Sequence, residues 1–315
     1  MIEKQYFSRV TALAGGVGGA KLAAGLSQLL AERLTVIVNT GDDFEHLGLR
    51  ISPDIDTVCY TLAGLSNLDT GWGRANETWN ALRTISELGG LDWFKLGDQD
   101  IGLHLERSRR LREGETLSQI TQDFCQAFNI QSNVLPMSDQ EVSTWVFTEN
   151  EELSFQEYFV HQQCKPNVKG FRFEGAEIAK PAPGILEDIA EAEIIVICPS
   201  NPWVSIGPIL AVPGILESLI DKQVIAVSPI IGGKAIKGPA AKMYSELGFT
   251  PSALAVARQY KDFLSGFVLD QVDQNLERET KNLGIQTYVT DSLMKTNQDR
   301  VRLAKEVIKF GERLI

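Results

Sequence analysis

RVTALAGGVGGAKLAAGLSQLL, residues 9–30, joins a short apolar run to an amphipathic segment through a glycine-rich turn. Leu22, Leu26 and Leu29 or Leu30 recur at spacings of three and four, which predicts a helix with one buried face. The next apolar run, LTVIVNT at residues 34–40, is continuous and β-branched, as in strands that are covered on both faces. A strand, a helix and a second strand in this order predict a parallel sheet.

The alternation of apolar runs and helical patterns returns in the second half of the chain. Strands are expected within residues 192–202, 223–233, 252–261 and 285–294, and a last helix within residues 298–314. We therefore predict an α/β fold with a doubly wound, mostly parallel, Rossmann-like sheet, forming a single domain over residues 1–315.

Two segments interrupt this pattern. Residues 54–129 show apolar spacings of three and four, with Asp, Asn or Thr at several starts and Gly near the stops, which predicts a helical insertion. Residues 140–175 contain alternating apolar and polar residues on either side of a polar TENEE turn, which predicts a small antiparallel β-hairpin subregion.

Composition limits the possible functions. The formal net charge of −11 argues against a general nucleic-acid binder, although a pocket for one nucleotide needs only a few local donors. The four cysteines are scattered, so a zinc site or a redox dithiol is not expected. The sequence shows no secretory pattern and no apolar run long enough to span a bilayer, so we expect a cytoplasmic protein without a membrane partner.

Four loops follow predicted parallel strands and are rich in Gly, Pro, Ser or Asn: AGGVGGAKL (14–22), NTGDDFEHLGLRISPD (39–54), CPSNPWVSIGP (198–208) and SPIIGGKAIKGPA (228–240). Ligands of open parallel sheets bind at the carboxyl ends of the strands. We therefore expect the four loops to meet on one rim of the sheet and to form the binding site.

Three of the loops are candidates for binding a nucleotide. In the first, Gly15, Gly16, Gly18, Gly19 and Lys21 precede or open a helix whose amides can hold a phosphate, although a tight turn that binds nothing has the same pattern. In the third, Ser200 and Asn201 can bond a base or sugar, or merely form a turn between prolines. In the fourth, the predicted anion-binding residues are Gly232, Gly233 and Lys234.

The second loop holds four aspartates. Asp42 and Asp43 follow a strand end, where carboxylate ligands of a divalent cation are expected, and Asp54 and Asp56 come about a dozen residues later. A structural role is equally open, because Asp42 after Gly41 suits a turn and Asp54 suits the start of a helix.

Two further aspartates, Asp98 and Asp100, and the histidine His104 lie in the helical segment. Asp100 and His104 are spaced i, i+4 and can share a helix face, but they are too few to bind zinc. The residues alone favour a helix capped near Asp98 or Asp100, with a solvated basic stripe at Arg107, Arg109, Arg110 and Arg112.

The motifs GGVGGAKL, NTGDD, GLRISPDIDT, GWGRANETWNAL, LGDQD, LPMSD, PSNPWVSIGPILAVPGI and SPIIGGKAIKGPA occur in this order between about Val10 and Gly248. This series resembles the 2-phospho-L-lactate transferase family of coenzyme F-420 biosynthesis, called phosphoenolpyruvate transferase in many bacteria. The resemblance implies a magnesium-dependent reaction in which a guanosine-diphosphate-activated phospholactate or phosphoenolpyruvate reacts with the ribityl hydroxyl of the deazaflavin Fo. GMP would leave, and F-420-0 or its dehydro form would result.

The resemblance also implies roles for particular residues. Asp42 and Asp43 are the expected catalytic residues and, with Asp54 and Asp56, the expected Mg²⁺ ligands. Trp72 and Thr78, with Trp79, could line a deazaflavin slot, and Asp98 and Asp100 become expected site residues without an assigned role. A homodimer is expected. The alternative is a non-catalytic regulator that binds a nucleotide or nucleotide sugar, because a related family shares the glycine-rich start and an aspartate pair after the second strand.

Overall fold

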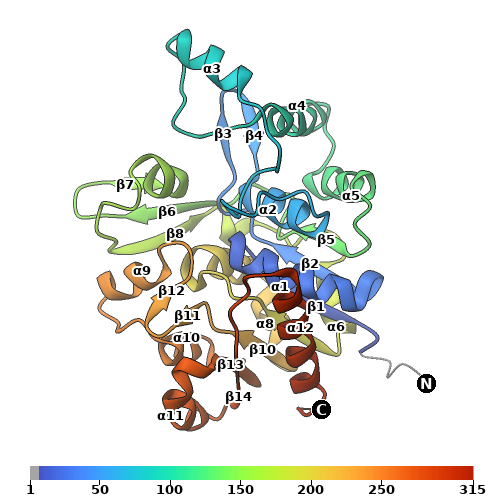
Figure 1. The fold of residues 1–315 in the computed structure, drawn as a ribbon, viewed down its shortest axis with the longest axis vertical. Helices are drawn as coiled ribbons and strands as arrows, with labels where there is room; N and C mark the ends of the chain where they lie inside the picture. Colours follow the sequence, from blue (N-terminus) through green and yellow to red (C-terminus); the bar gives the residue numbers. More distant parts are fainter. Residues whose placement is uncertain (1–6, 315) are drawn as a thin grey trace.

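The computed structural model describes residues 7–314 and centres on a seven-stranded sheet in which every neighbouring pair of strands is parallel (Figure 1). The strand order is β14-β13-β10-β9-β1-β2-β5. The bounds are β1 (Val10–Ala14), β2 (Leu34–Val38), β5 (Asn133–Pro136), β9 (Ile194–Ile197), β10 (Val224–Val227), β13 (Gly266–Asp270) and β14 (Gln286–Thr290). The predicted doubly wound α/β fold is confirmed.

The strand order reverses between β1 and β9. From β1 the chain adds β2 and β5 on one side, and after β9 it adds β10, β13 and β14 on the other side. Such a reversal opens a crevice at the carboxyl ends of the two central strands, which is where open α/β sheets bind ligands. The glycine-rich turn follows β1 and the loop that begins at Cys198 follows β9, so both meet at this crevice.

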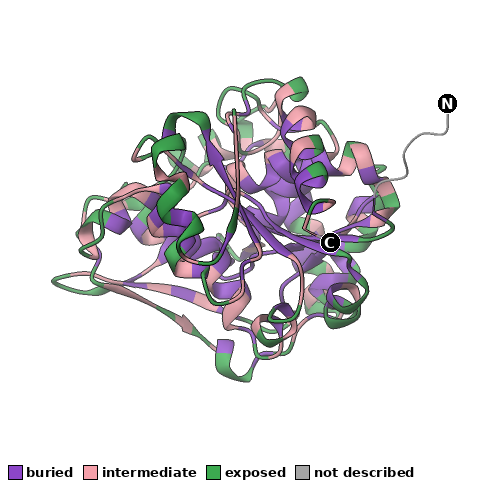
Figure 2. Cartoon of the chain, turned by 90° about the horizontal axis from the view of Figure 1, so that it is seen from below, coloured by how far each residue is buried: buried purple, intermediate pink, exposed green. Residues whose placement is uncertain are grey.

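Helices cover both faces of the sheet, so the buried sheet forms the centre of the molecule (Figure 2). Neighbouring residues of β1 point to opposite faces, and accordingly Ala12 and Ala14 belong to one apolar core while Leu13 belongs to the other. One core packs against α1 (Gly16–Leu30), α2 (Pro53–Leu62), α5 (Leu117–Ala127) and α12 (Asn297–Gly311). The other packs against α6 (Ile185–Glu191), α7 (Gly207–Ala211), α8 (Ile215–Leu219), α9 (Ala240–Glu246) and α10 (Ala253–Tyr260).

Two smaller units extend from this body. The hairpin β3 (Phe44–His46) and β4 (Leu49–Ile51) carries α3 (Asn80–Glu87) and α4 (Asp98–Arg112) at its side and far end (Figure 1). An antiparallel sheet of β6 (Ser143–Phe147), β7 (Glu152–Ser154) and β8 (Gly170–Glu174) lies beside it. The remaining elements are η1 (Ala31–Arg33), η2 (Glu157–His161), η3 (Ala176–Ile178), η4 (Pro202–Ile206), β11 (Ile230–Ile231), β12 (Lys234–Ala235), η5 (Gln271–Leu276) and α11 (Glu277–Lys281).

The expected subregions correspond to these units. The helices α2 to α5 occupy the predicted insertion at 54–129, and β6 to β8 confirm antiparallel pairing within 140–175. The ends of the predicted domain, residues 1–6 and 315, lie outside the described residues. Within residues 7–314 no helix has the length and apolar character needed to cross a membrane.

The sequence prediction is wrong for the segment at 252–261. This segment forms α10, because the Ser252 hydroxyl accepts a hydrogen bond from the Ala255 amide and starts a helix. A short apolar run fits a buried helix as well as a strand, and the actual strand, β13, comes next in the chain. The hairpin β3–β4 and strand β5 are additional to the prediction.

A close approach of α1 and α12 gives a test of the packing. A Cβ atom at Gly25 would lie 2.2 Å from the backbone oxygen of Arg300, so Gly25→Ala forces the helices apart. We predict that this variant loses about 1–3 kcal/mol of unfolding free energy in urea titrations. Gly102→Ala is the matched control, because Gly102 lies in α4 with open space around its Cβ position, and should gain roughly 0.5–1 kcal/mol. Equal effects of the two substitutions would contradict the packing.

Candidate active site at the topological switch point

The Asp54 carboxylate joins three segments at the switch point. Its Oδ1 accepts the backbone amide of Gly16 at 2.7 Å, and its Oδ2 accepts the Asn39 side-chain amide at 2.9 Å. Asp54 lies in the first turn of α2 after Pro53, but its Oδ1 bonds the start of α1 and its Oδ2 bonds Asn39, rather than its own helix. The sequence suggests that Asp54 caps its own helix, α2. In the structure it instead caps the start of α1, where the helix dipole favours a negative charge.

The glycine-rich turn packs tightly against the loop after β9. The Gly15 amide donates to the Ser200 hydroxyl at 3.0 Å, and that hydroxyl donates to the Gly15 carbonyl at 2.8 Å. A Cβ atom at Gly18 would lie 2.3 Å from the Pro199 carbonyl oxygen, and one at Gly19 would lie 2.3 Å from the Ser200 hydroxyl. These glycines therefore let the two loops meet, and the amides of Gly15 and Gly16 already have partners within the protein.

Asp42 and Asp43 are buried beside this junction with one oxygen each left without a partner. The Oδ1 atoms of both carboxylates are inaccessible and form no hydrogen bond. Burial raises the pKa of Asp42, and the nearby charge of Asp54 raises it further. Burial likewise raises the pKa of Asp54 to about 6 and the pKa of Asp43 to about 7. Ionised carboxylates in this position need a cation to offset their desolvation.

This arrangement fits a divalent cation held by few protein ligands. Asp42 and Asp54 influence each other directly, and Asp42 Oδ1 is free to coordinate. Within residues 7–314 no group of three or more His, Cys, Asp and Glu side chains is placed to hold a metal. Mg²⁺ commonly binds through one or two carboxylates and completes its shell with water and substrate phosphates, so two carboxylates suffice.

Like Asp54, the other two predicted metal ligands, Asp43 and Asp56, accept hydrogen bonds from the protein. The Ser52 hydroxyl donates to Asp43 Oδ2 at 2.6 Å, and the Arg50 Nε lies 3.9 Å from the same oxygen. Asp56 accepts two hydrogen bonds from the Arg107 guanidinium, one of them from Nη1 to Oδ2 at 3.1 Å. Asp56 thus joins α2 to α4.

The pair of Asp56 and Arg107 continues into a buried polar chain along α4. Arg107 Nη1 lies 3.2 Å from His104 Nδ1, and His104 Nε2 lies 3.5 Å from Asp100 Oδ1. The Tyr60 hydroxyl donates to the same oxygen of Asp100 at 2.6 Å. The expected solvated stripe is wrong for Arg107, which is only 1% exposed. The missed signal is spacing, because Asp100, His104 and Arg107 share one face of α4.

Asp98 has a capping role in the structure. Its carboxylate accepts hydrogen bonds from the Thr78 hydroxyl at 2.6 Å and from the Ala81 amide at 3.0 Å at the start of α3. These bonds, the Thr78 bond first, lower the pKa of Asp98 to about 2. Trp72 and Trp79 are 45% and 43% exposed, so their rings are available to a ligand.

Most of the remaining residues predicted to contact a nucleotide form hydrogen bonds within the protein. Asn201 accepts the Trp203 amide at 3.0 Å and caps η4, so its oxygen is engaged. The Gly232 amide donates to Asp273 Oδ2 at 2.9 Å in the turn that also holds Gly233, and Lys234 is exposed. Lys21 donates to the Met294 carbonyl at 3.0 Å.

Asn39 and Ser52 are site residues that the sequence prediction missed. Asn39 holds Asp54 through its amide and accepts the Gly41 amide through Oδ1 at 2.9 Å, and Ser52 holds Asp43. Asn39 ends the apolar run of β2, and a polar residue at that position is a signal for a site residue.

The fold and the acidic cluster define a Rossmann-like α/β protein with its site at the switch point of the sheet. The chain belongs to the 2-phospho-L-lactate transferase (CofD) family, whose model matches residues 10–309. It is therefore a transferase of the coenzyme F-420 pathway, of the 2-phospho-L-lactate or phosphoenolpyruvate type.

Relatives match the chain along almost its whole length. The phosphoenolpyruvate transferase of Kitasatospora aureofaciens is 41% identical over 97% of this chain and 98% of its own length. The 2-phospho-L-lactate transferase of Methanopyrus kandleri is 39% identical over 98% of this chain and 99% of its own. The crystal structure of a UPF0052 family member from Bacillus halodurans shares the fold with a TM-score of 0.61 at 15% identity, covering 96% of this chain and 99% of that one.

The unpartnered carboxylates predict a metal-dependent stability. Mg²⁺ should raise the melting temperature of the wild-type protein, because binding to the folded state at a hundredfold excess over Kd adds about 2.7 kcal/mol. Asp42→Asn should raise the melting temperature of the metal-free protein and abolish the Mg²⁺ response, since it removes one of two neighbouring buried charges. The control Asp221→Asn, at an exposed residue after α8, should behave as wild type. A full Mg²⁺ response in Asp42→Asn would contradict this assignment.

The buried ion pair gives a second stability test. Arg107→Met leaves Asp56 without its partner and should cost about 3–5 kcal/mol of unfolding free energy. Arg109→Met is the matched control on the same helix, because Arg109 is exposed and pairs with Glu106 and Glu113 at the surface. Its effect should stay below about 1 kcal/mol. Similar losses in the two variants, measured by urea unfolding, would show that the buried pair has no special role.

Proposed function

We propose that this transferase moves a phospholactyl or phosphoenolpyruvyl group from a guanosine-diphosphate-activated donor to the terminal ribityl hydroxyl of the deazaflavin Fo. GMP leaves, and F-420-0 or dehydro-F-420-0 forms. The observation that carries the proposal is the pair of buried carboxylates, Asp42 and Asp54, at the switch point of a chain of this family, in which Asp42 Oδ1 has no hydrogen-bond partner. Such a pair suits a diphosphate that arrives with its metal ion.

The reaction makes one bond and breaks another. The ribityl oxygen bonds to the distal phosphorus, the bond from that phosphorus to the bridging oxygen breaks, and GMP leaves with the electron pair. The hydroxyl proton must go to a base or to solvent. Asp43 suits this task, because its Oδ1 is free and burial raises its pKa to about 7. The Ser52 hydroxyl would hold the other oxygen and orient the carboxylate.

Asp42 and Asp54 would hold Mg²⁺, with Asn39 fixing the position of Asp54. When bound, the ion would neutralise charge on the diphosphate and favour departure of GMP. Asp56 supports the site differently, because its bond to Arg107 holds α2, the helix that carries Asp54. The exposed ring of Trp72 offers a surface on which the deazaflavin could stack, with Thr78 nearby in the chain.

The direct test combines purified protein with Fo, Mg²⁺ and a panel of guanylated donors that carry lactyl, enolpyruvyl or glyceryl groups. We expect GMP release and a phosphodiester product, identified by mass, with at least one donor. Absence of GMP with every donor would refute the proposal. Tight binding of a UDP-sugar without binding of GDP in calorimetry would instead favour a regulator.

A single substitution tests the role of Asp43. Asp43→Asn keeps the shape of the side chain but removes the base, so kcat should fall by about 10²–10⁴-fold with a smaller change in KM. Asp221→Asn should retain wild-type kcat, and size-exclusion chromatography of both proteins would test the expected homodimer. Wild-type kcat in Asp43→Asn would remove Asp43 from the proton transfer.

A further inference from the structure

Three cationic side chains line one face of α1. Val17, Lys21 and Gly25 are spaced i, i+4 and i+8, so they follow one another along that face. At the N-terminal end of this face, a Cβ atom at Gly71 would lie 2.9 Å from Val17 Cγ1 and 2.7 Å from Lys237 Nζ, so the Lys237 amine lies beside Val17. Toward the C-terminal end of this face, the backbone of Arg300 lies against Gly25. Lys237, Lys21 and Arg300 therefore gather from three separate segments.

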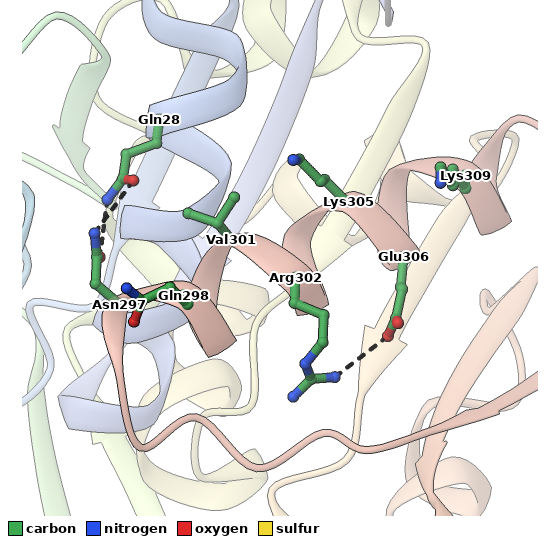
Figure 3. A pocket seen from close by; sticks show the side chains of 8 residues that line it. All are labelled: Gln28, Asn297, Gln298, Val301, Arg302, Lys305, Glu306 and Lys309. Atoms are coloured by element: carbon green, nitrogen blue, oxygen red, sulfur yellow. Dashed lines mark hydrogen bonds and ion pairs between the residues drawn. The ribbon is translucent and has the colours of Figure 1, made fainter.

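No carboxylate accompanies these cations. Within residues 7–314, none of the three forms an ion pair: Lys21 donates to the Met294 carbonyl, and Lys237 donates to the Thr70 carbonyl. Arg300 is 9% exposed, and its Nε is buried without a hydrogen-bond partner. Two other arginines show the contrast. Arg107 is more deeply buried than Arg300 but bonds Asp56. Arg302, two residues further along α12, faces a groove on the surface and pairs with Glu306 (Figure 3).

The pKa values of the cluster also indicate cations without an acidic partner. Burial lowers the pKa of Lys21, and the positive charges of Arg300 and Lys237 lower it further. Burial alone lowers the pKa of Arg300, with no acid to raise it. The chain carries eleven more acidic than basic side chains, yet no acidic residue between 7 and 314 forms an ion pair with these cations. A buried cation that has no ion-pair partner and is repelled by neighbouring cations, as Arg300 is, destabilises a fold unless an anion binds beside it.

We propose that Lys21, Lys237 and Arg300 form an oxyanion subsite that takes a phosphate group of the nucleotide substrate. A guanidinium and two amines are the usual protein partners of a phosphate. The subsite lies on the Val17–Lys21 face of α1, whereas Gly18 and Gly19 face the loop after β9. Diphosphate binding would thus use cations from one side of α1 and the Asp42–Asp54 pair with its metal ion from the other. The identity of the nucleotide rests on the function proposed above, whereas the binding of phosphate does not.

Melting temperatures measured with and without inorganic phosphate test the subsite independently of enzymatic activity. Arg300→Met should melt at the same temperature as wild type or higher in phosphate-free buffer, because it removes an unpaired buried charge. Inorganic phosphate should raise the melting temperature of the wild type and leave that of Arg300→Met unchanged. Arg302→Met, on the same helix, should keep the wild-type response to phosphate. A lower melting temperature for Arg300→Met in phosphate-free buffer would make Arg300 a structural residue and overturn the inference.

Affinity measurements identify the ligand. Calorimetry at low salt without Mg²⁺ would compare inorganic phosphate, GMP and GDP. Arg300→Met and Lys237→Met should each weaken GDP binding about tenfold to a hundredfold, as expected for losing a charge-assisted bond to phosphate. Lys237 is exposed, so Lys237→Met is not expected to disturb folding. Its GDP affinity therefore tests the subsite independently of Arg300→Met. Wild-type GDP and phosphate affinities in both variants would refute the subsite.

The outcomes for the subsite and for the proposed function are separable. If wild-type protein releases GMP from a donor while both variants bind GDP and phosphate normally, the subsite is refuted and the transferase reaction stands. If phosphate binds and depends on Arg300 and Lys237 but no donor is turned over, the subsite stands and the proposed reaction fails.

Discussion

The two hydrogen bonds of the Asp54 carboxylate hold the site together. One bond fixes the first turn of α1, and the other fixes Asn39 at the end of β2. Because the carboxylate belongs to α2, a single side chain joins α1, the end of β2 and α2. The absence of a side chain at Gly15 makes this possible, since a Cβ atom there would lie 2.6 Å from Asp54 Oδ2. The position of Asp42, and with it the acidic cluster, depends on this junction.

Charge is distributed unevenly around α1. Buried carboxylates gather at its start, where the Oδ1 atoms of Asp42 and Asp43 have no hydrogen-bond partner, and cations without an ion-pair partner gather along the face that holds Lys21. Either group alone would destabilise the folded chain through desolvation. A metal-bound diphosphate carries both signs of charge, so one ligand could satisfy both groups.

Much of this arrangement could be predicted from the sequence, and particular residues show why the rest could not. The β-α-β opening and the loops at strand ends follow from local patterns, so the sheet and the meeting of the loops after β1 and β9 could be predicted. Arg107 and Arg300 were different. Their burial depends on contacts with distant segments, and a charged residue on an amphipathic helix shows no local sign of being buried. The roles of Asp54 and Asp98 as caps of other helices are non-local for the same reason.

The central claim is that Asp42 and Asp54 hold the divalent cation of a bound nucleotide diphosphate. Crystals grown with GDP and Mn²⁺, an anomalous scatterer that accepts the same oxygen ligands as Mg²⁺, test it directly. The account predicts an anomalous peak within bonding distance of the Asp42 and Asp54 carboxylates, with phosphate oxygens completing the coordination. GDP bound at the switch point with the peak elsewhere, or with no peak, would contradict the account.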